Sequence, residues 1–411
     1  MKSICFCNSA IPWGGGEKWH YTAARSFAAR GWRVLLICHP EGVLYERAAQ
    51  LEGVERVPFA LGRLSFLNPL TCLRLRRFFR REAVHALVVN LPADLKAAAP
   101  AAKSAGVRHV VYRRGSALPV RDTWLNRYLL GKVITGFIAN SEATKARALV
   151  NNPSIIDPKR ISVLYNGIDV AAFDADLARA ADRGEVFFPP TQSGRRPFVI
   201  GNAGRLHRQK GQHLLLYLGR RLLDAGLDCR ILVAGAGERE TELKNLAADL
   251  GLGDKALFCG FLPDLAPFWR SIDLFALTSL WEGFGNVLLE AMLARKPVFA
   301  FAVSNLPELV RDGPEGNGKL FPLPDEELFR CRVKGRAGEE ERVIPAVFAG
   351  SGDEREKRDG LTMMAEAVLV LSRDPEKMRR MGLAGRAFAQ RFSLQASMDE
   401  LEALLPYGHN L

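Results

Sequence analysis

The chain has 411 residues, of which 48% are hydrophobic and 25% are charged. A chain of this length is predicted to form about two or three domains, each with its own core. No apolar run approaches the roughly 20 residues of a membrane helix, and the first residues are too briefly apolar for a secretory signal, which indicates a cytoplasmic protein. The seven cysteines are scattered and form no cluster with zinc-ligand spacing, which argues against a metal site.

The net charge of +12 lies entirely in the first half of the chain. Residues 1–190 contain 27 Lys and Arg against 15 Asp and Glu, whereas residues 191–411 contain 30 against 30. A basic half favours an anionic partner, such as a phosphorylated glycolipid, an anionic membrane surface or a nucleic acid. A chance bias of surface residues is the alternative.

The first half alternates short apolar runs with helical patterns. Residues 3–7 form an expected strand, a glycine-rich loop follows over residues 10–17, and residues 19–29 have helical spacing. Further expected strands lie at residues 32–38, 86–90, 107–112 and 136–140. Such alternation predicts an α/β domain with a parallel, doubly wound sheet over residues 1–180.

Basic residues mark two places in this half. Residues 70–81 form a basic helix, which either lies on an anionic membrane or packs on the sheet with its arginines outward. Arg113 and Arg114 follow the expected strand 107–112, at the edge where parallel sheets bind ligands. We expect these two arginines to meet a phosphate of a ligand.

The second half repeats the alternation after a break. Between residues 169 and 197 the alternation gives way to an alanine-rich, charged and proline-containing stretch. Residues 181–196 of this stretch are the expected linker, and residues 197–392 form the expected second domain. Its expected strands lie at residues 198–201, 229–234, 256–259, 274–278 and 297–301. Residues 329–359 are charged and glycine-rich and are interpreted as an inserted surface loop, and a last helix follows in residues 393–411.

Residues 281–290 are predicted to form a ligand loop. They join the apolar run 274–279 to a helix that ends before Pro297, so the order is strand, tight loop, helix. In that order the N–H groups of the helix start can bind phosphate at the carboxyl end of the strand. Glu282 then faces the ligand and Glu290 can accept hydrogen bonds from a ribose diol. The alternative is that Glu290 only complements the helix dipole and Glu282 is solvated.

Three motifs together resemble those of the retaining GT-B glycosyltransferases of family 4. They are EGFGNVLLE at residues 282–290, NAGRLHRQKG at 202–211 and NGID at 166–169. With smaller matches, the resemblance runs in the family's order from residue 13 to about residue 392. The resemblance implies two Rossmann-like, doubly wound domains that face each other across a cleft. Residues 1–180 would form the acceptor side and residues 197–392 the donor side. The helix in residues 393–411 would return to the first domain.

The resemblance also implies roles for the residues at matching positions. Arg205 and Lys210 are expected to neutralise charge on the leaving diphosphate, the arginine through its fork of donors and the lysine as a point charge. Glu282 is expected near the transferred sugar and its phosphate, and Glu290 on the ribose. Backbone groups expected to contact the donor belong to Gly15, Gly16, Gly204, Gly285, Asn286 and Val287.

The chain departs from the family in two places. Many members carry a histidine in the catalytic cleft after the strand at 86–90, where this chain continues with NLPAD at residues 90–94. Asp94 is the candidate catalytic replacement, with a first-turn acid of a helix as the alternative. A glycine pair of the family is replaced by VSNL at residues 303–306, where Asn305 and Glu308 are expected to begin a helix in the manner of a capping box.

The resemblance predicts a metal-independent, retaining glycosyltransferase. The enzyme would move a sugar from a nucleotide diphosphate-sugar to an anionic glycolipid or cell-envelope saccharide, as in lipopolysaccharide biosynthesis. Arg113 and Arg114 are the expected acceptor contacts, no cofactor is expected besides the co-substrate, and the basic half favours peripheral contact with the inner face of a membrane. The alternatives are a GT-B sugar-nucleotide epimerase, a transferase for soluble acceptors, and a nucleic-acid-binding protein, although the basic residues lack interleaved aromatic platforms.

Two further patterns carry less weight. Gly235-Ala236-Gly237 follows an expected strand but lacks the third glycine of a dinucleotide fingerprint, which argues against NAD. Asp174-Ala175-Asp176 resembles a metal-binding DxD motif, yet it lies in the alanine-rich, charged stretch that leads into the expected linker. A solvated pair of acids is favoured there.

Overall fold

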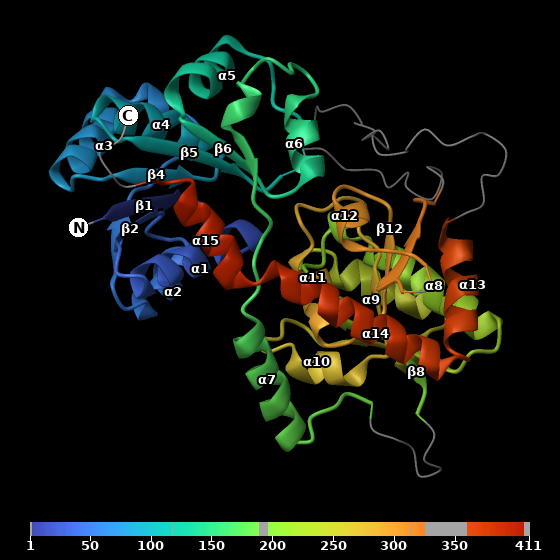
Figure 1. Ribbon diagram of the computed structural model, residues 1–411. Coiled ribbons are helices and arrows are strands. Elements are labelled where there is room, and N and C mark those ends of the chain that lie inside the picture. The colour runs from blue at the N-terminus through green and yellow to red at the C-terminus, as the bar shows by residue number, and fades with distance from the viewer. Residues whose placement is uncertain (1, 117, 189–195, 314, 325–359, 407–411) are drawn as a thin grey trace. The chain divides into compact units, whose positions relative to one another are not determined.

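The computed structural model describes residues 2–116, 118–188, 196–313, 315–324 and 360–406. The chain divides into two compact units, of which the first comprises Met1–Gly167 and Phe392–Leu411 and the second Ile168–Arg391 (Figure 1). Each unit contains its own parallel sheet, which confirms the predicted fold class of two Rossmann-like α/β domains. The expected insertion 329–359, Cys331 and residues 189–195 of the expected linker lie outside the described residues.

The first unit is built on a seven-stranded parallel sheet in the order β3-β2-β1-β4-β5-β6-β7. All residues of β1 are buried without alternation, because helices cover both faces of the sheet. The order reverses between β1 and β4, which pair directly. The strands are β1 (Ser3–Asn8), β2 (Arg33–Cys38), β3 (Val54–Pro58), β4 (Ala86–Val89), β5 (His109–Arg114), β6 (Gly136–Ala139) and β7 (Ile161–Val163).

Two hydrophobic cores lie on opposite faces of this sheet. One joins Phe6 of β1 to Phe27 of α1 and Leu401 of α15, and the other joins Cys5 and Cys7 to the helices α3 and α4. Cys5 and Cys7 share a face, as their spacing in a strand indicates. The helices and turns are α1 (Gly15–Ala29), α2 (Val43–Arg47), η1 (Ala48–Gln50), η2 (Ser65–Leu67), α3 (Pro69–Arg81), α4 (Pro92–Ser104), α5 (Trp124–Tyr128), η3 (Leu129–Val133), α6 (Glu142–Leu149), η4 (Pro158–Arg160) and α15 (Leu394–Ala403).

The second unit contains a six-stranded parallel sheet in the order β10-β9-β8-β11-β12-β13. Its strands are β8 (Phe198–Ala203), β9 (Cys229–Ala234), β10 (Ala256–Phe258), β11 (Leu274–Leu277), β12 (Val298–Phe301) and β13 (Gly318–Phe321). Its helices and turns are α7 (Val170–Asp182), η5 (Arg208–Lys210), α8 (Gln212–Asp224), α9 (Glu240–Asp249), η6 (Gly253–Lys255), α10 (Ala266–Ser271), α11 (Asn286–Leu293), α12 (Leu306–Leu309), α13 (Gly360–Leu371) and α14 (Pro375–Ala389), and η8 (Gln390–Phe392) leads out of the unit. None of the described helices is long and apolar enough to cross a membrane.

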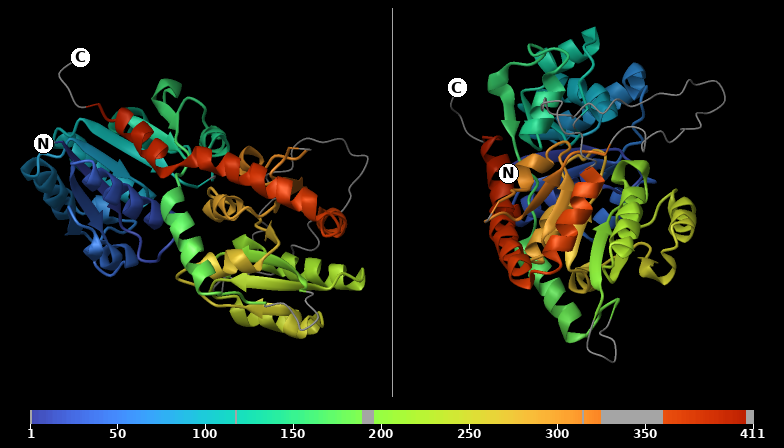
Figure 2. Two further views of the ribbon diagram at one scale, coloured as in Figure 1. Left: turned by 60° about the horizontal axis from the view of Figure 1, so that its bottom comes forward. Right: turned by 90° about the vertical axis from the view of Figure 1, so that its right-hand side faces the viewer.

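The chain passes between the units twice. Figure 2 follows the second passage in red, from α13 through α14 to α15. Helix α15 packs on the first unit, where Trp32 Nε1 donates to Glu402 Oε1 at 3.0 Å and Ser397 Oγ donates to the Tyr165 carbonyl at 2.8 Å. Gly167 is the last residue before the first passage. It has no room for a side chain, because an added Cβ would lie 2.6 Å from the Cα of Leu394.

Helix α7 occupies residues that the sequence assigned to the end of the first domain and its linker. Its Asp174 accepts hydrogen bonds from Arg386 of α14 at 2.9 and 2.7 Å, which ties α7 to the second unit. The first unit therefore ends at Gly167 and not at residue 180. The alanine-rich sequence that suggested a linker forms a helix, because alanine has the highest helix propensity.

Candidate active site

The second unit places two loops side by side at the carboxyl edge of its sheet. Strands β8 and β11 are neighbours, and the strand order reverses between them. Doubly wound sheets bind their ligands at such a switch point. The loop 204–211 follows β8 and the loop 278–285 follows β11, so two of the sequence motifs meet there.

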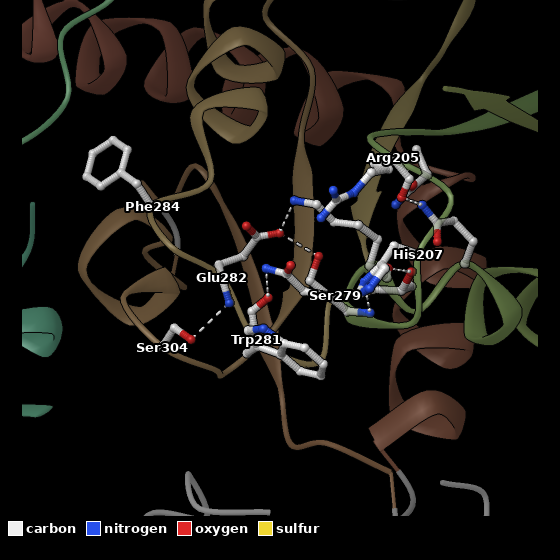
Figure 3. Close-up of polar contacts among 12 residues, drawn as sticks. Arg205, His207, Ser279, Trp281, Glu282, Phe284 and Ser304 are labelled. Atoms are coloured by element: carbon white, nitrogen blue, oxygen red, sulfur yellow. Dashed lines mark hydrogen bonds and ion pairs between the residues drawn. The ribbon is translucent and has the colours of Figure 1, made fainter. Parts of the chain in front are cut away.

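Lys210 and Glu282 form an ion pair at the centre of these loops (Figure 3). Lys210 Nζ and Glu282 Oε1 are 2.6 Å apart, and the hydroxyl of Ser279 donates to the same carboxylate oxygen at 2.6 Å. The Glu282 side chain is 4% exposed and that of Lys210 is 19% exposed, so the carboxylate is enclosed while the ammonium keeps access to solvent. The pair holds the lysine in place at the edge of the sheet.

Hydrogen bonds between the two loops support this pair. Leu280 N donates to the Gln209 carbonyl at 2.8 Å, and Gln209 Nε2 donates to the Trp281 carbonyl at 3.0 Å. Gly211 ends the first loop with a φ of 59°, and a Cβ at this position would lie 2.0 Å from the Thr278 carbonyl oxygen. Glycine is therefore required for the loops to approach so closely.

A third segment, after β12, holds the backbone of Glu282. Ser304 Oγ accepts a hydrogen bond from Glu282 N at 3.0 Å, and Ser304 has a φ of 52°, the left-handed conformation that suits a glycine. Asn305 does not cap α12 with its side chain, so the expected capping box is wrong. Its Nδ2 instead donates to the Phe284 carbonyl at 2.8 Å, which fixes the second loop.

Arg205 lies beside the ion pair without joining it. Its side chain is exposed and makes no hydrogen bond or ion pair with any residue that the structure describes, while Gln212 Nε2 holds its carbonyl at 3.1 Å. In Figure 3 its side chain is directed to the same side of the loops as Glu282. A guanidinium with free donors next to a held ammonium is suited to bind a diphosphate.

The other predicted donor contacts surround the start of α11. Gly285 precedes the helix with a φ of 85°, and Asn286 and Val287 are its first two residues. A helix start leaves backbone N–H groups without partners inside the helix. Glu290 is half-buried and is the fifth residue of α11, just past its first turn. Gly204 follows β8, where an added Cβ would lie 3.4 Å from Lys210 Cε.

The first unit gathers another set of predicted residues where β1 and β4 end. Gly15 and Gly16 are the first residues of α1 and not part of a loop. Asp94, in the first turn of α4, is 0% exposed and accepts hydrogen bonds from Ser9 N at 3.2 Å and from Ser9 Oγ. Burial raises the pKa of the Asp94 carboxyl to about 6, although the bonds from Ser9 act in the opposite direction. The structure thus places Asp94 as a buried first-turn acid that holds the segment after β1.

Arg113 is also buried, contrary to its expected place beside an acceptor phosphate. Its Nη2 donates to Asn166 Oδ1 at 2.7 Å, its Nη1 donates to Asn90 Oδ1 at 3.2 Å, and its guanidinium carbon lies 4.2 Å from the centre of the Trp19 ring. Burial lowers the pKa of Arg113 to about 9. Arg113 is 1% exposed and therefore binds the strand ends together instead of facing a ligand, while Arg114 is half-buried.

The two weaker sequence patterns have structural explanations. A Cβ on Gly235 would lie 2.0 Å from the Gly204 carbonyl oxygen, and a Cβ on Gly237 would lie 2.3 Å from the Leu206 carbonyl oxygen. Both glycines therefore allow adjacent loops to pack closely. Asp174 is paired with Arg386 and Asp176 with Arg179. Within the described ranges, no three His, Cys, Asp or Glu side chains lie close enough together to hold a metal ion.

The sequence did not reveal Ser279, Gln209 and Ser304. Ser279 could have been found from the sequence, because its hydroxyl lies at the end of an expected strand and three residues before Glu282, close enough to reach that carboxylate. Gln209 and Ser304 could not have been found, since their partners lie in other segments of the chain.

Both units match known protein families. Residues 13–172 match the family described as Glycosyltransferase Family 4, and residues 185–334 match the family described as Glycosyl transferases group 1. Together the two matches cover most of both units.

Curated relatives and solved structures extend this finding. The lipopolysaccharide core biosynthesis mannosyltransferase LpsB of Rhizobium meliloti is 31% identical over 215 residues, 51% of this chain and 57% of the relative. The D-inositol 3-phosphate glycosyltransferase of Corynebacterium kroppenstedtii is 32% identical over 190 residues, 44% of this chain and 41% of the relative, so the chain spans roughly half of the length of these relatives. The structure of Anabaena Alr3699/HepE in complex with UDP and glucose has a TM-score of 0.74 at 21% identity over 98% of this chain and 99% of that chain, which shows a shared fold.

Proposed function

The chain belongs to the family 4 and group 1 glycosyltransferases of the GT-B fold, and we propose that it transfers a sugar from a nucleotide diphosphate-sugar to an anionic glycolipid or cell-envelope saccharide. The proposal includes retention of the anomeric configuration, and it assigns the neutralisation of the diphosphate to protein cations without a metal. The observation that carries it is the Lys210–Glu282 pair with Arg205 beside it.

The cations of the second unit suit the departure of a nucleoside diphosphate. Negative charge grows on the leaving phosphate oxygens in the transition state, and fixed cations stabilise that state more than the ground state. Lys210 is already oriented by Glu282, so little reorganisation accompanies the reaction. Retention by attack on the same face of the sugar needs no protein nucleophile, which agrees with a Glu282 carboxylate that is engaged with Lys210 and Ser279.

The start of α11 suits the rest of the donor. Its first N–H groups can bind phosphate, and Glu290, one turn further on, can accept hydrogen bonds from the ribose hydroxyls. The HepE structure contains UDP and glucose, which supports a nucleotide-sugar as the donor class. UDP, GDP and ADP all carry the diphosphate and ribose that these residues would bind.

The charge of the first unit supports an anionic acceptor. Residues 1–167 and 392–411 carry 25 Lys and Arg against 13 Asp and Glu, a net +12, and residues 168–391 carry 32 against 32. One relative is named for lipopolysaccharide core biosynthesis and the other for inositol phosphate, so both names contain an anionic acceptor or pathway. We assign the lipopolysaccharide-type acceptor to this chain because its first unit also has a surface suited to membranes.

That surface surrounds the beginning of α3. Leu64 and Leu67 precede α3 and Leu70 is its second residue, and they are 69%, 65% and 69% exposed. Exposed arginines follow along α3. Exposed leucines next to arginines suit the boundary between lipid headgroups and acyl chains of an anionic membrane. The buried residues Leu75, Phe78 and Phe79 pack α3 against the core of the first unit, so the exposed start of α3 and the segment before it are left for the membrane. Peripheral contact at the cytoplasmic face of the membrane is part of the proposal.

Sedimentation with vesicles tests the membrane contact. The double substitution Leu67→Glu and Leu70→Glu is expected to abolish cosedimentation with phosphatidylglycerol-containing vesicles, because two charges would enter the apolar layer. Val370→Glu, at a 62% exposed site in the second unit, is the matched control. Equal binding by both variants would contradict this contact.

A transfer assay tests the activity. Purified protein is incubated in EDTA with UDP-, GDP- and ADP-sugars and with detergent-solubilised rough lipopolysaccharide, before and after chemical dephosphorylation. We expect an α-linked product from one donor and much less product on the dephosphorylated acceptor. Conversion of the nucleotide-sugar to an epimer without any acceptor would instead support an epimerase.

A further inference from the structure

Asn90 stands where β1 and β4 end in the first unit. It directly follows β4 and lies one residue beyond the Cys7–Val89 pair of the sheet. The strand order of the first sheet reverses here, and such a switch point is where doubly wound sheets bind ligands. Because Asp94 is buried against Ser9, it leaves this edge to Asn90.

Arg113 fixes the orientation of the Asn90 amide. Its Nη1 donates to Asn90 Oδ1 at 3.2 Å, and a guanidinium can only donate, so the amide oxygen must face Arg113. The amide NH₂ group consequently points the other way. Arg113 is itself held by Asn166 and Trp19. Turning the amide over would leave a buried cation without this acceptor, which is unfavourable.

The Asn90 NH₂ group faces the start of α1. Its Nδ2 lies 2.8 Å from the position of an added Cβ on Gly16, whereas Asn8 Nδ2 lies 3.8 Å from the same point. Asn8 Nδ2 donates to Glu17 Oε1 at 3.0 Å, but Asn90 Nδ2 donates to no residue in the described part of the chain. Asn90 as a whole residue is half-buried, and its NH₂ group is an oriented donor that no described residue uses.

We propose that Asn90 is a substrate-binding residue, whose NH₂ group donates a hydrogen bond to a substrate oxygen at the carboxyl edge of the first unit. Arg113 is the positioning residue that holds the amide in this orientation. The inference rests on the proposed function, because the ligand is a hydroxyl or phosphate oxygen of either the acceptor or the donor sugar. Asn90, and not Asp94, then stands in for the histidine of related enzymes.

The geometry can be tested without any substrate. Gly16→Ala places a Cβ against Asn90 Nδ2 and is expected to lower Tm by about 2–4 °C. In an Asn90→Ala background the space is free and alanine favours the helix, so the same substitution is expected not to lower Tm. An equal effect in both backgrounds would overturn the placement of the amide.

Kinetics of Asn90→Asp separate a binding role from a structural one. The new carboxylate would pair with the buried Arg113, so Tm is expected to stay or rise, but the NH₂ donor is lost. We expect kcat/KM to fall about 10- to 100-fold for Asn90→Asp and for Asn90→Ala. Asn126→Ala, on α5 of the same unit, should remain within about threefold. A fully active Asn90→Asp variant would overturn the proposal.

Hydrolysis of the donor by water identifies the substrate that Asn90 contacts. If Asn90 binds the acceptor, Asn90→Ala raises the acceptor KM and leaves hydrolysis of the UDP-, GDP- or ADP-sugar unchanged. If it binds the donor sugar, hydrolysis falls as well. A wild-type protein that neither binds nor hydrolyses any of these nucleotide-sugars would refute the proposed function and this inference with it. The Gly16 test would still report on the amide geometry in that case.

Discussion

A lysine that is held by a buried glutamate is the central residue-scale feature of the second unit. Glu282 is nearly inaccessible and Lys210 retains one open side, so the pair presents a cation and conceals an anion. We therefore interpret the pair as a site that binds an anion. A role in stability is less suited to it, because a buried ion pair contributes little to the free energy of unfolding by itself.

Substitution of Lys210 should therefore affect catalysis strongly. A charge-assisted contact contributes roughly 1.5–3 kcal/mol, and its loss lowers a rate about 10- to 100-fold. Because diphosphate charge grows in the transition state, we expect Lys210→Ala to lower kcat by at least about 100-fold. Turnover is measured on protein shown to be folded by thermal unfolding. Lys244→Ala, at an exposed helical ion pair, is the control, and a Lys210 variant within about threefold of wild type would remove Lys210 from the mechanism.

Asp94 predicts a pH-dependent stability. Its folded pKa of about 6 exceeds the ordinary value of 3.8, so the folded state binds an extra proton between these values. The stability from this group is fully present below pH 3.8 and is lost as the pH rises through 6.

The substitution Asp94→Asn isolates this effect, because an amide does not titrate in this range. Between pH 5 and 7.5 the free energy of unfolding of wild type should fall relative to that of Asp94→Asn by about 1 kcal/mol, or about 2–4 °C in Tm. Thermal unfolding at both pH values measures the difference. Asp249→Asn, at an exposed site, is the control for the loss of a surface carboxylate. A difference in the free energy of unfolding between wild type and Asp94→Asn that is the same at both pH values would refute the raised pKa.

Some residue-scale features could be predicted and others could not. The motifs placed Lys210 and Glu282 near one ligand, and the structure joins them across 72 positions of sequence. The prediction that Arg113 faces a ligand was wrong. Residues at a strand end point to both faces of the sheet, and the local sequence does not indicate which face is covered by other elements. Asn90 was overlooked because an asparagine gains its role only from Arg113, which fixes its amide.

At the scale of elements, close contact of the loops after β8 and β11 builds the site. The Thr278 carbonyl would collide with any side chain at position 211, so the glycine permits the contact and not only the turn. The order strand, loop, helix at residues 274–293 was predicted correctly, because the apolar run and the helical period are both local signals. Helix α7 was missed because its neighbours Arg386 and α10 lie far away in the sequence.

Two glycine substitutions separate backbone conformation from contact. Gly226 has a φ of 81° with nothing near an added Cβ, whereas Gly211 has a φ of 59° and a carbonyl in the way. Gly226→Ala should cost about 1–2 kcal/mol through the left-handed conformation alone. Gly211→Ala should lower the free energy of unfolding by about 1–3 kcal/mol more than Gly226→Ala does, because the loops must move apart. Urea unfolding measures both, and equal costs would show that the contact between the loops is unimportant.

At the scale of the whole molecule, the two units differ in charge although they share an architecture. The first carries the entire net charge and the second is neutral. The two sheets were predicted because each strand is a short apolar run between helical patterns. The first unit ends at Gly167 because α7 packs with the second unit, and local sequence does not contain that information.

Donor binding by the second unit is the central claim, and thermal stabilisation tests it most directly. Wild type and Glu290→Ala are heated in EDTA with UDP, GDP, ADP and their sugars. We predict that one nucleotide raises the Tm of wild type in the presence of EDTA and that the shift disappears in Glu290→Ala. No shift with any nucleotide, or the same shift in the variant, would contradict the assignment of the donor site.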